Sequence, residues 1–476
     1  DIYMKKNFIL LITLLTAFVS QAQVKLGSPF GDNMVLQQNA DVSIWGSASP
    51  GCELKIVAGW NIHDTTVVSV DHFGKWKAQL RTIEAGGPYE IQILGDNGYL
   101  GAGQNSIRNV MLGEVWLCSG QSNMEWTYSH GLGNPEKEIP AADYPDIRIY
   151  TVPKVASAHE QDHCGGRWEV CTPEVMKRSS AVAYFYARQL HKKLGVPVGV
   201  VVSAWGGTNA EVWVKESAIQ ADEALLATSR KHQPQPWWPC EPGVCYNSMI
   251  YPLVPFTFAG FIWYQGEANA GKGLYPTYDA LMRTLIQSWR NDFGADLPFY
   301  FVQIAPFKYN EEGANYLREQ QARTALYENT GMIVISDLID GNVQNIHPLN
   351  KWDVGDRLAN LALAKTYHQI GFPYLYPRFD TMEVRGKKAY LSFTDCTAPL
   401  QIKGKQIQDL QVAGEDGVFV NAEAKVEKDK LVVWSKQVKK IKAVRYAFTN
   451  TAIGNLFSAE GLPVIPFRTD TDHDNR

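Results

Sequence analysis

Ser122 and His347 are the residues whose types and settings best suit nucleophilic catalysis. Ser122 lies in Gly-Gln-Ser-Asn-Met (120–124) and His347 lies in Ile-His-Pro (346–348), each beyond an apolar run. A serine becomes a nucleophile when a base takes its proton, and an imidazole with a pKa of about 6.5 is such a base near neutral pH. The pair predicts acyl transfer that fails as the pH falls through that value. A helix N-cap is the alternative role for Ser122, and a satisfied surface or core position is the alternative for His347.

Two more loops carry polar residues directly after apolar runs. They are Trp-Gly-Gly-Thr (205–208) and Trp-Tyr-Gln-Gly-Glu (263–267). Gly207 can present a backbone N–H to an oxyanion, and Gln265 or Asn269 can add a side-chain amide, whereas Glu267 can instead be an ion-pair partner that orients its loop. Ligands of open α/β sheets bind beyond the carboxyl ends of the strands, so these loops predict one common site.

The elements that would position these loops are strands alternating with helices. Strands are expected at 114–118, 196–204, 258–264, 299–304 and 332–336. Apolar residues recur at helical spacing over 183–194, 278–289 and 354–362, with Ser179 or Ser180 as the cap of the first helix. This alternation predicts an α/β domain over residues 111–372, built on a doubly wound parallel sheet.

Short β patterns flank that domain on both sides. An N-terminal β module is expected over 24–110, with strands near 42–45, 54–56, 68–70 and 89–93 and a hairpin corner at 72–76. A C-terminal β region is expected over 375–470, with strands near 389–393, 418–420, 431–434 and 444–448. Whether the two β regions fold separately or share one sandwich is left open.

The N-terminus and the composition bear on location and partners. A basic start, an apolar run from Phe8 to Val19 and small residues up to Ala22 are typical of a signal peptide over 4–22, so export to the periplasm or the exterior is expected. No later segment is apolar enough to span a membrane. The net charge of -4, from 45 Lys+Arg against 49 Asp+Glu, argues against a nucleic-acid partner.

Seven cysteines allow small disulfide loops at Cys164/Cys171 and Cys240/Cys245, with buried free thiols as the alternative. Neither close pair has the spacing of a zinc site, and neither a metal nor an organic cofactor is expected.

The four loop motifs together resemble the blocks of the SGNH hydrolase superfamily, and within it the chain resembles bacterial sialate O-acetylesterases. Met-Val-Leu-Gln (34–37) and the segments Gly-Leu-Pro (461–463) and Pro-Phe-Arg-Thr-Asp (466–470) are similar to segments of that family. The resemblance implies an SGNH-type fold. It also implies that Ser122 is the nucleophile, that His347 is the base, and that the N–H groups of Ser122 and Gly207 line the oxyanion hole.

The chain departs from the superfamily at two positions. The third oxyanion donor is an Asn in the superfamily, and here Gln265 and Asn269 are the candidates. The superfamily often has Asp three residues before its His, where this chain has Gln344. Asp337, Asp340 or a main-chain carbonyl near Gln344 is then the candidate to orient the imidazole, or the site is a Ser–His dyad.

The expected reaction is hydrolysis of O-acetyl groups on sugars through an acetyl-enzyme, with O-acetylated sialic acid on glycans as the first substrate class. Acetylated xylan or another polysaccharide is the alternative substrate, because acetylxylan esterases share this catalytic domain. A glycan-binding protein on an inert hydrolase scaffold is the alternative from another class. The oligomeric state is not predicted.

Overall fold

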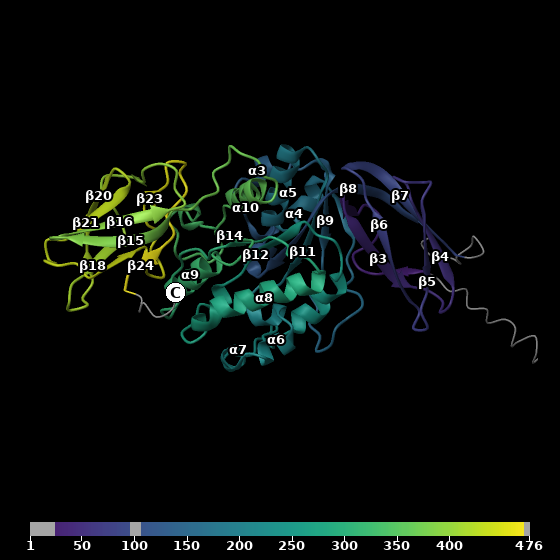
Figure 1. The fold of residues 1–476 in the computed structure, drawn as a ribbon, viewed down its shortest axis with the longest axis horizontal. Helices are drawn as coiled ribbons and strands as arrows, with labels where there is room; N and C mark the ends of the chain where they lie inside the picture. Colours follow the sequence, from purple (N-terminus) through teal and green to yellow (C-terminus); the bar gives the residue numbers. More distant parts are fainter. Residues whose placement is uncertain (1–23, 96–105, 471–476) are drawn as a thin grey trace, which may run out of the picture.

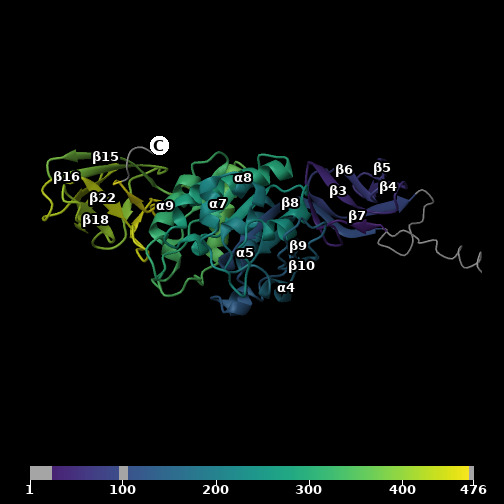
Figure 2. The same cartoon turned by 90° about the horizontal axis from the view of Figure 1, so that it is seen from below.

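The computed structural model describes residues 24–95 and 106–470, so the expected signal peptide lies outside the described residues. Three regions follow one another along the long axis of the molecule: N-terminal strands, a central α/β region and C-terminal strands (Figure 1, Figure 2). Among the described residues, no helix has the length and apolar character needed to cross a membrane.

The central sheet is built around the long strand β8 (Ser106–Gly120). Its strands run in the order β10-β9-β11-β8-β12-β13-β14. The parallel neighbours of β8 are β11 (Val198–Ala204) and β12 (Gly260–Tyr264), followed outward on the β12 side by β13 (Phe299–Val302) and β14 (Thr330–Ile333). Every residue of these four flanking strands is buried, as expected where helices cover both faces of a parallel sheet.

Helices lie on both sides of this sheet. α5 (Ala181–Leu194) and α10 (Trp352–Lys365) pack together on one side, and α8 (Tyr278–Phe293) lies on the other (Figure 1). Ser180 caps α5, because its Oγ accepts the Ala183 N–H at 3.1 Å. The loops that follow β8, β11, β12 and β14 therefore emerge from one edge of the sheet.

The sequence patterns missed several elements of the central region, among them β9, β10 and α9. β9 (Tyr144–Thr151) pairs in parallel with β11, and β10 (Trp168–Cys171) closes that edge in the antiparallel sense. α9 (Ala314–Thr324) connects β13 to β14 and packs on α8. The mean hydropathy of α9 is low because its buried face carries polar residues. Asn315, Arg318 and Gln321 are buried there, and each takes part in hydrogen bonds. Hydrophobic periodicity could not reveal such a helix.

The N-terminal strands are continuous with the central sheet. β4 (Glu53–Ala58), β5 (Thr65–Ser69) and β7 (Gly86–Gly95) extend the first half of β8, and β2 (Val35–Gln37) pairs with its middle. β1 (Lys25–Leu26), β3 (Asp41–Ser47) and β6 (Lys75–Arg81) form a second sheet. The boundary expected at 110/111 thus falls inside β8, because no turn interrupts the buried run from Val110 to Gly120. The corner at 72–76 links two sheets and closes no hairpin, since β5 pairs with β4 and β6 pairs with β3.

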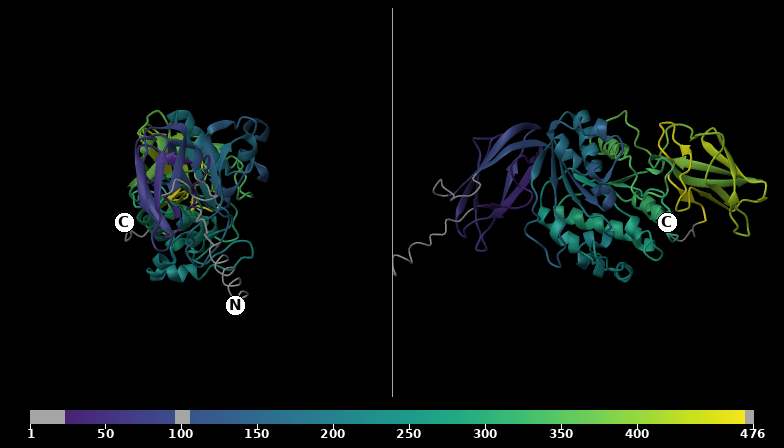
Figure 3. Two further views of the ribbon diagram at one scale, coloured as in Figure 1. Left: turned by 90° about the vertical axis from the view of Figure 1, so that its right-hand side faces the viewer. Right: turned by 180° about the vertical axis from the view of Figure 1, so that it is seen from behind.

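The C-terminal strands have a hydrophobic core of their own, separate from the core shared by the N-terminal and central regions. Two four-stranded sheets are present: β15 (Arg378–Arg385), β16 (Lys388–Thr394), β21 (Lys430–Trp434) and β20 (Glu423–Glu427) form one, and β19 (Val420–Asn421), β18 (Leu410–Ala413), β22 (Ala443–Tyr446) and β24 (Phe467–Arg468) form the second. β17 (Gln401–Ile402) and β23 (Leu456–Phe457) form a small third sheet. The two β regions lie at opposite ends of the molecule (Figure 3), so they share no sandwich.

All seven cysteines are free thiols, so the free-thiol alternative holds and neither of the two possible disulfide loops is formed. The sulfurs of the buried Cys164 and Cys171 have other partners: Cys164 contacts the Tyr150 hydroxyl, and the Cys171 thiol donates to the Ala142 carbonyl at 3.7 Å.

Candidate functional site

Ser122 is held at the turn that leaves β8. It is the first residue of the short helix α2 (Ser122–Glu125), and Gln121 stands at the N-cap position. The Oγ of Ser122 lies 2.9 Å from Nε2 of His347. The Ser122 hydroxyl therefore contacts an imidazole and does not cap the helix. The two residues are 225 positions apart in the sequence.

His347 reaches the turn from the loop between β14 and α10. Its ring stacks on Trp126 with the centroids 4.0 Å apart and the planes inclined by 21°. Burial, the Lys351 ammonium and His130 lower the pKa of His347 from 6.5 to about 4. The imidazole is thus neutral throughout the physiological range, which is the form that accepts a proton.

None of the four candidate orienting groups hydrogen-bonds to His347 among the described residues. Gln344 and Asp340 are exposed. Asp337 forms a bidentate ion pair with Arg357, at 2.8 and 2.6 Å. Glu267 accepts from the Asn123 Nδ2 at 2.6 Å. In this geometry a Ser–His dyad is formed without a carboxylate on the imidazole.

A buried polar network lies beneath the dyad, and sequence reasoning did not find it. The Lys351 Nζ donates to the Asn123 Oδ1, and the Asn123 Nδ2 donates both to Glu267 and to the Ile346 carbonyl at 3.0 Å. Lys351 and Asn123 are fully buried. Burial lowers the pKa of Lys351 to about 7 and raises that of Glu267. The network ties the loops after β8, β12 and β14 together, directly beside the histidine.

The glycine loop after β11 lies against the nucleophile turn. The Gly206 N–H donates to the Glu125 Oε2 at 2.5 Å, and Lys154 balances that carboxylate at 2.7 Å from its Oε1. Gly207 has φ +84°, and a Cβ there would lie 2.3 Å from the Trp238 ring, so this position requires glycine. Glu125 and Trp238 therefore fix the backbone that carries the Gly207 N–H.

Gln265 and Asn269 are placed behind the cavity, with their amides engaged. The Gln265 Nε2 donates to the Thr208 carbonyl at 3.3 Å and to the Asn269 Oδ1 at 2.7 Å, which uses both of its N–H groups. The Asn269 Oδ1 also accepts the Ala210 N–H at 3.0 Å. Both side chains are fully buried and neither lines the cavity. This arrangement supports the glycine loop and does not favour either amide as an oxyanion donor.

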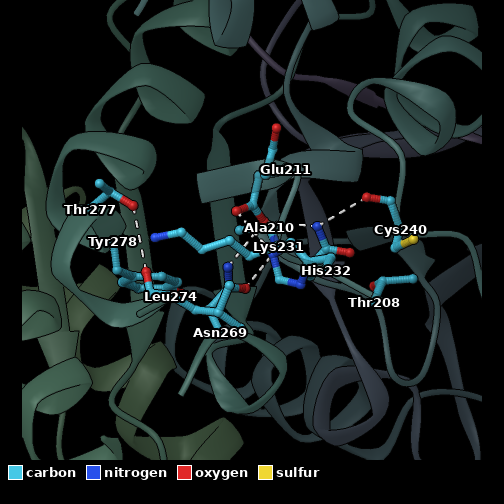
Figure 4. Close-up of polar contacts among 12 residues, drawn as sticks. Thr208, Ala210, Glu211, Lys231, His232, Cys240, Asn269, Leu274, Thr277 and Tyr278 are labelled. Carbon is cyan, nitrogen blue, oxygen red and sulfur yellow. Dashed lines mark hydrogen bonds and ion pairs between the residues drawn. The ribbon is translucent and has the colours of Figure 1, made fainter. Parts of the chain in front are cut away.

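A carboxylate–imidazole pair, Glu211 and His232, completes that support (Figure 4). Glu211 accepts from Asn269 at 3.0 Å and from Asn209 at 2.8 Å, and it lies 3.1 Å from Nε2 of His232. Burial raises the pKa of Glu211, but the hydrogen bonds from His232, Asn269 and Asn209 outweigh burial and lower it. Glu211 is thus a charged anchor under the loop.

Ser122, His347 and Gly207 face a cavity of about 730 Å³, in the size range of small-molecule sites. Gln121 also lines this cavity, and its Oε1 accepts the N–H groups of Gly266 and Ala268 at 3.3 and 3.2 Å. The other wall is aromatic and basic: Trp126, His130, Lys154, Trp205, Lys231, His232, Trp237 and Trp238.

A serine next to a neutral histidine in such a cavity, at the carboxyl edge of a parallel sheet, is the arrangement of an ester hydrolase. Residues 112–364, just over half of the chain, match the model of a carbohydrate esterase family described as sialic acid-specific acetylesterase. The chain belongs to this family.

Relatives of this family are similar to most of the chain. A human sialate O-acetylesterase is 30% identical over 407 residues, which cover 78% of this chain and 76% of that protein. The mouse sialate O-acetylesterase is 29% identical over 447 residues, covering 81% and 82%. The crystal structure of a carbohydrate acetylesterase from Xanthomonas citri has a TM-score of 0.84 at 35% identity, covering 94% of this chain and all of that one.

Proposed function

We propose that the protein is a serine esterase that removes O-acetyl groups from sialic acid on glycans. The observation that carries the proposal is the 2.9 Å contact between the Ser122 Oγ and the His347 Nε2 inside a cavity large enough for a sugar. The names of the relatives, sialate O-acetylesterase and carbohydrate acetylesterase, support the substrate class. We further propose that the signal peptide expected over 4–22 directs this activity outside the cytoplasm.

The reaction proceeds through an acetyl-enzyme. The Ser122 Oγ attacks the acetyl carbonyl while the His347 Nε2 takes the hydroxyl proton. The tetrahedral intermediate collapses, the bond to the sugar oxygen breaks, and the imidazolium returns its proton to that oxygen. Water, deprotonated by the same histidine, then attacks the acetyl group and releases acetate and the free serine. The chain's own residues supply the nucleophile, the base and the oxyanion donors, and no cofactor is proposed.

The oxyanion is held by the backbone N–H groups of Ser122 and Gly207. For the third donor we favour Gln121 over Gln265 and Asn269. Its Oε1 is fixed by two backbone N–H groups, and the side chain lines the cavity, so its Nε2 is the amide left to face the substrate. Loss of one such donor lowers kcat by about 10²–10³. We therefore expect that loss from Gln121→Ala. For Gln265→Ala we expect mainly lower stability, and the reverse pattern would restore Gln265 as the donor.

The decisive experiment measures acetate release from O-acetylated sialoglycan and from acetylated xylan, by the wild type and by Ser122→Ala. Release from the sialoglycan that Ser122→Ala abolishes is the expected result. Release from xylan alone would keep the mechanism and change the substrate to a plant polysaccharide. Equal rates in both proteins would refute Ser122 as nucleophile, and glycan binding without any release would favour the non-catalytic alternative.

A further inference from the structure

One wall of the cavity is a single loop with an unusual composition. Residues 231–240 read Lys-His-Gln-Pro-Gln-Pro-Trp-Trp-Pro-Cys, and seven of them line the cavity. Proline fixes φ, so the three prolines restrict the conformations of the loop before any ligand binds. The loop is therefore a preformed wall.

Trp237 is the exposed aromatic residue of this wall. Its side chain is 76% exposed, although it lines the same cavity as Ser122 and His347. Its backbone is anchored, because the Trp205 Nε1 donates to the Trp237 carbonyl at 3.3 Å and the neighbouring Trp238 ring covers Gly207. An anchored indole left open to solvent contributes little to the core, and its flat apolar face suits the apolar face of a sugar ring.

Lys231 supplies a positive charge that no carboxylate balances among the described residues. Its Nζ donates to the Gly273 carbonyl at 2.9 Å, which leaves two N–H donors. The other basic residues that line the cavity have partners: Lys154 is ion-paired with Glu125, His232 is hydrogen-bonded to Glu211, and His130 accepts the Thr127 N–H. Figure 4 shows Lys231 extending away from the Glu211–His232 pair, toward Leu274. Both carboxylates that line the cavity are likewise engaged, Glu125 by Lys154 and Glu267 by Asn123.

We propose that the loop 231–240 is a recognition site for an acidic sugar, in which Lys231 binds the sugar carboxylate and Trp237 stacks on the ring. This inference rests on the proposed function and deepens it. An acetylated sialic acid carries a carboxylate that an acetylated xylose lacks, so Lys231 would be the residue that separates the two substrate classes.

The test compares kcat/KM for three acetyl esters: an O-acetylated sialoside, an acetylated xylo-oligosaccharide and a small ester without a sugar. Lys231→Met should lower the ratio of sialoside to small-ester activity about ten- to a hundredfold, the range of a charge-assisted hydrogen bond, and should leave the ratio of xylo-oligosaccharide to small ester unchanged. Trp237→Ala should lower both sugar ratios about three- to tenfold. Lys405→Met and Phe73→Ala, which alter an exposed lysine and an exposed aromatic residue in the two β regions, are the matched controls and should leave every ratio unchanged.

Binding measured in the Ser122→Ala background separates this proposal from the proposed function. The dissociation constant of the O-acetylated sialoside should rise at least tenfold on adding Lys231→Met. An equal loss for charged and neutral sugars, or no loss for either, would overturn the role of Lys231. Failure of wild type to hydrolyse the sialoside while it still hydrolyses the other esters would instead refute the proposed substrate.

Discussion

The histidine base should stay active at a pH where an ordinary histidine fails. Burial, with the charges of Lys351 and His130, lowers the pKa of His347 to about 4. At pH 5 about 90% of the imidazole is then unprotonated, compared with about 3% at a pKa of 6.5. Lowering the pH from 7 to 5 should therefore cost about a tenth of kcat/KM, whereas with an unperturbed histidine kcat/KM would fall about 25-fold.

The assay is kcat/KM for a neutral acetyl ester from pH 3.5 to 8, read as acetate released. Acetate is the better readout because a chromogenic leaving group would itself titrate. Near-UV circular dichroism over the same range controls for acid unfolding. Stability itself should fall between pH 6.5 and 4, because the unfolded chain takes up a proton there that folded His347 refuses. An acid limb at pH 6.5 in a folded enzyme would refute the reasoning.

Three substitutions probe the surroundings of the dyad, and a fourth, Gly195→Ala, is the control for Gly207→Ala. Lys351→Met removes a cation that is protonated at pH 5, so the acid limb should move up from about 4 toward 6.5, and an unchanged limb would deny the coupling. Gly207→Ala should lower kcat about 10²–10³-fold, because its Cβ meets an indole. Gly195→Ala, with a similar φ and open space, should cost only about 1 kcal/mol of stability. Asp337→Asn should weaken its ion pair with Arg357 and lower the free energy of unfolding by about 1–3 kcal/mol. Asp337→Asn should leave the pH profile of kcat/KM unchanged. A shifted profile would indicate that Asp337 orients the His347 imidazole after all.

The sequence predicted the central strands and the loops well, for a physical reason. Buried parallel strands read as unbroken apolar runs, and chain direction places their carboxyl ends at one edge. The 2.9 Å approach of Ser122 to His347 follows from that placement. The edge strand β10 has no comparable run, and α9 buries polar side chains, so neither stood out.

The partners of the site residues were harder to predict. Gln265 and Asp337 lie in the expected loops. However, the Gln265 amide is bonded to Thr208 and Asn269, and the Asp337 carboxylate is bonded to Arg357. Loop membership follows from topology, whereas the direction of a side chain depends on packing with residues far away in sequence. The buried Lys351 gave no signal, because a lysine before a helix is normally exposed.

The surroundings of His347 explain how a dyad can work here without a carboxylate. An aspartate on the second ring nitrogen would orient the imidazole and raise its pKa. In this protein the orientation comes from neutral contacts: the Trp126 ring at 4.0 Å, and the Asn123 bond to the carbonyl of Ile346, the residue just before the histidine. Burial lowers the pKa of His347 most, and the Lys351 cation lowers it further. Uncharged groups therefore hold the ring in place, while the Lys351 cation acts on its pKa without contacting it in any hydrogen bond described. Substitutions of Trp126 should change kcat at every pH, whereas substitutions of Lys351 should move the acid limb.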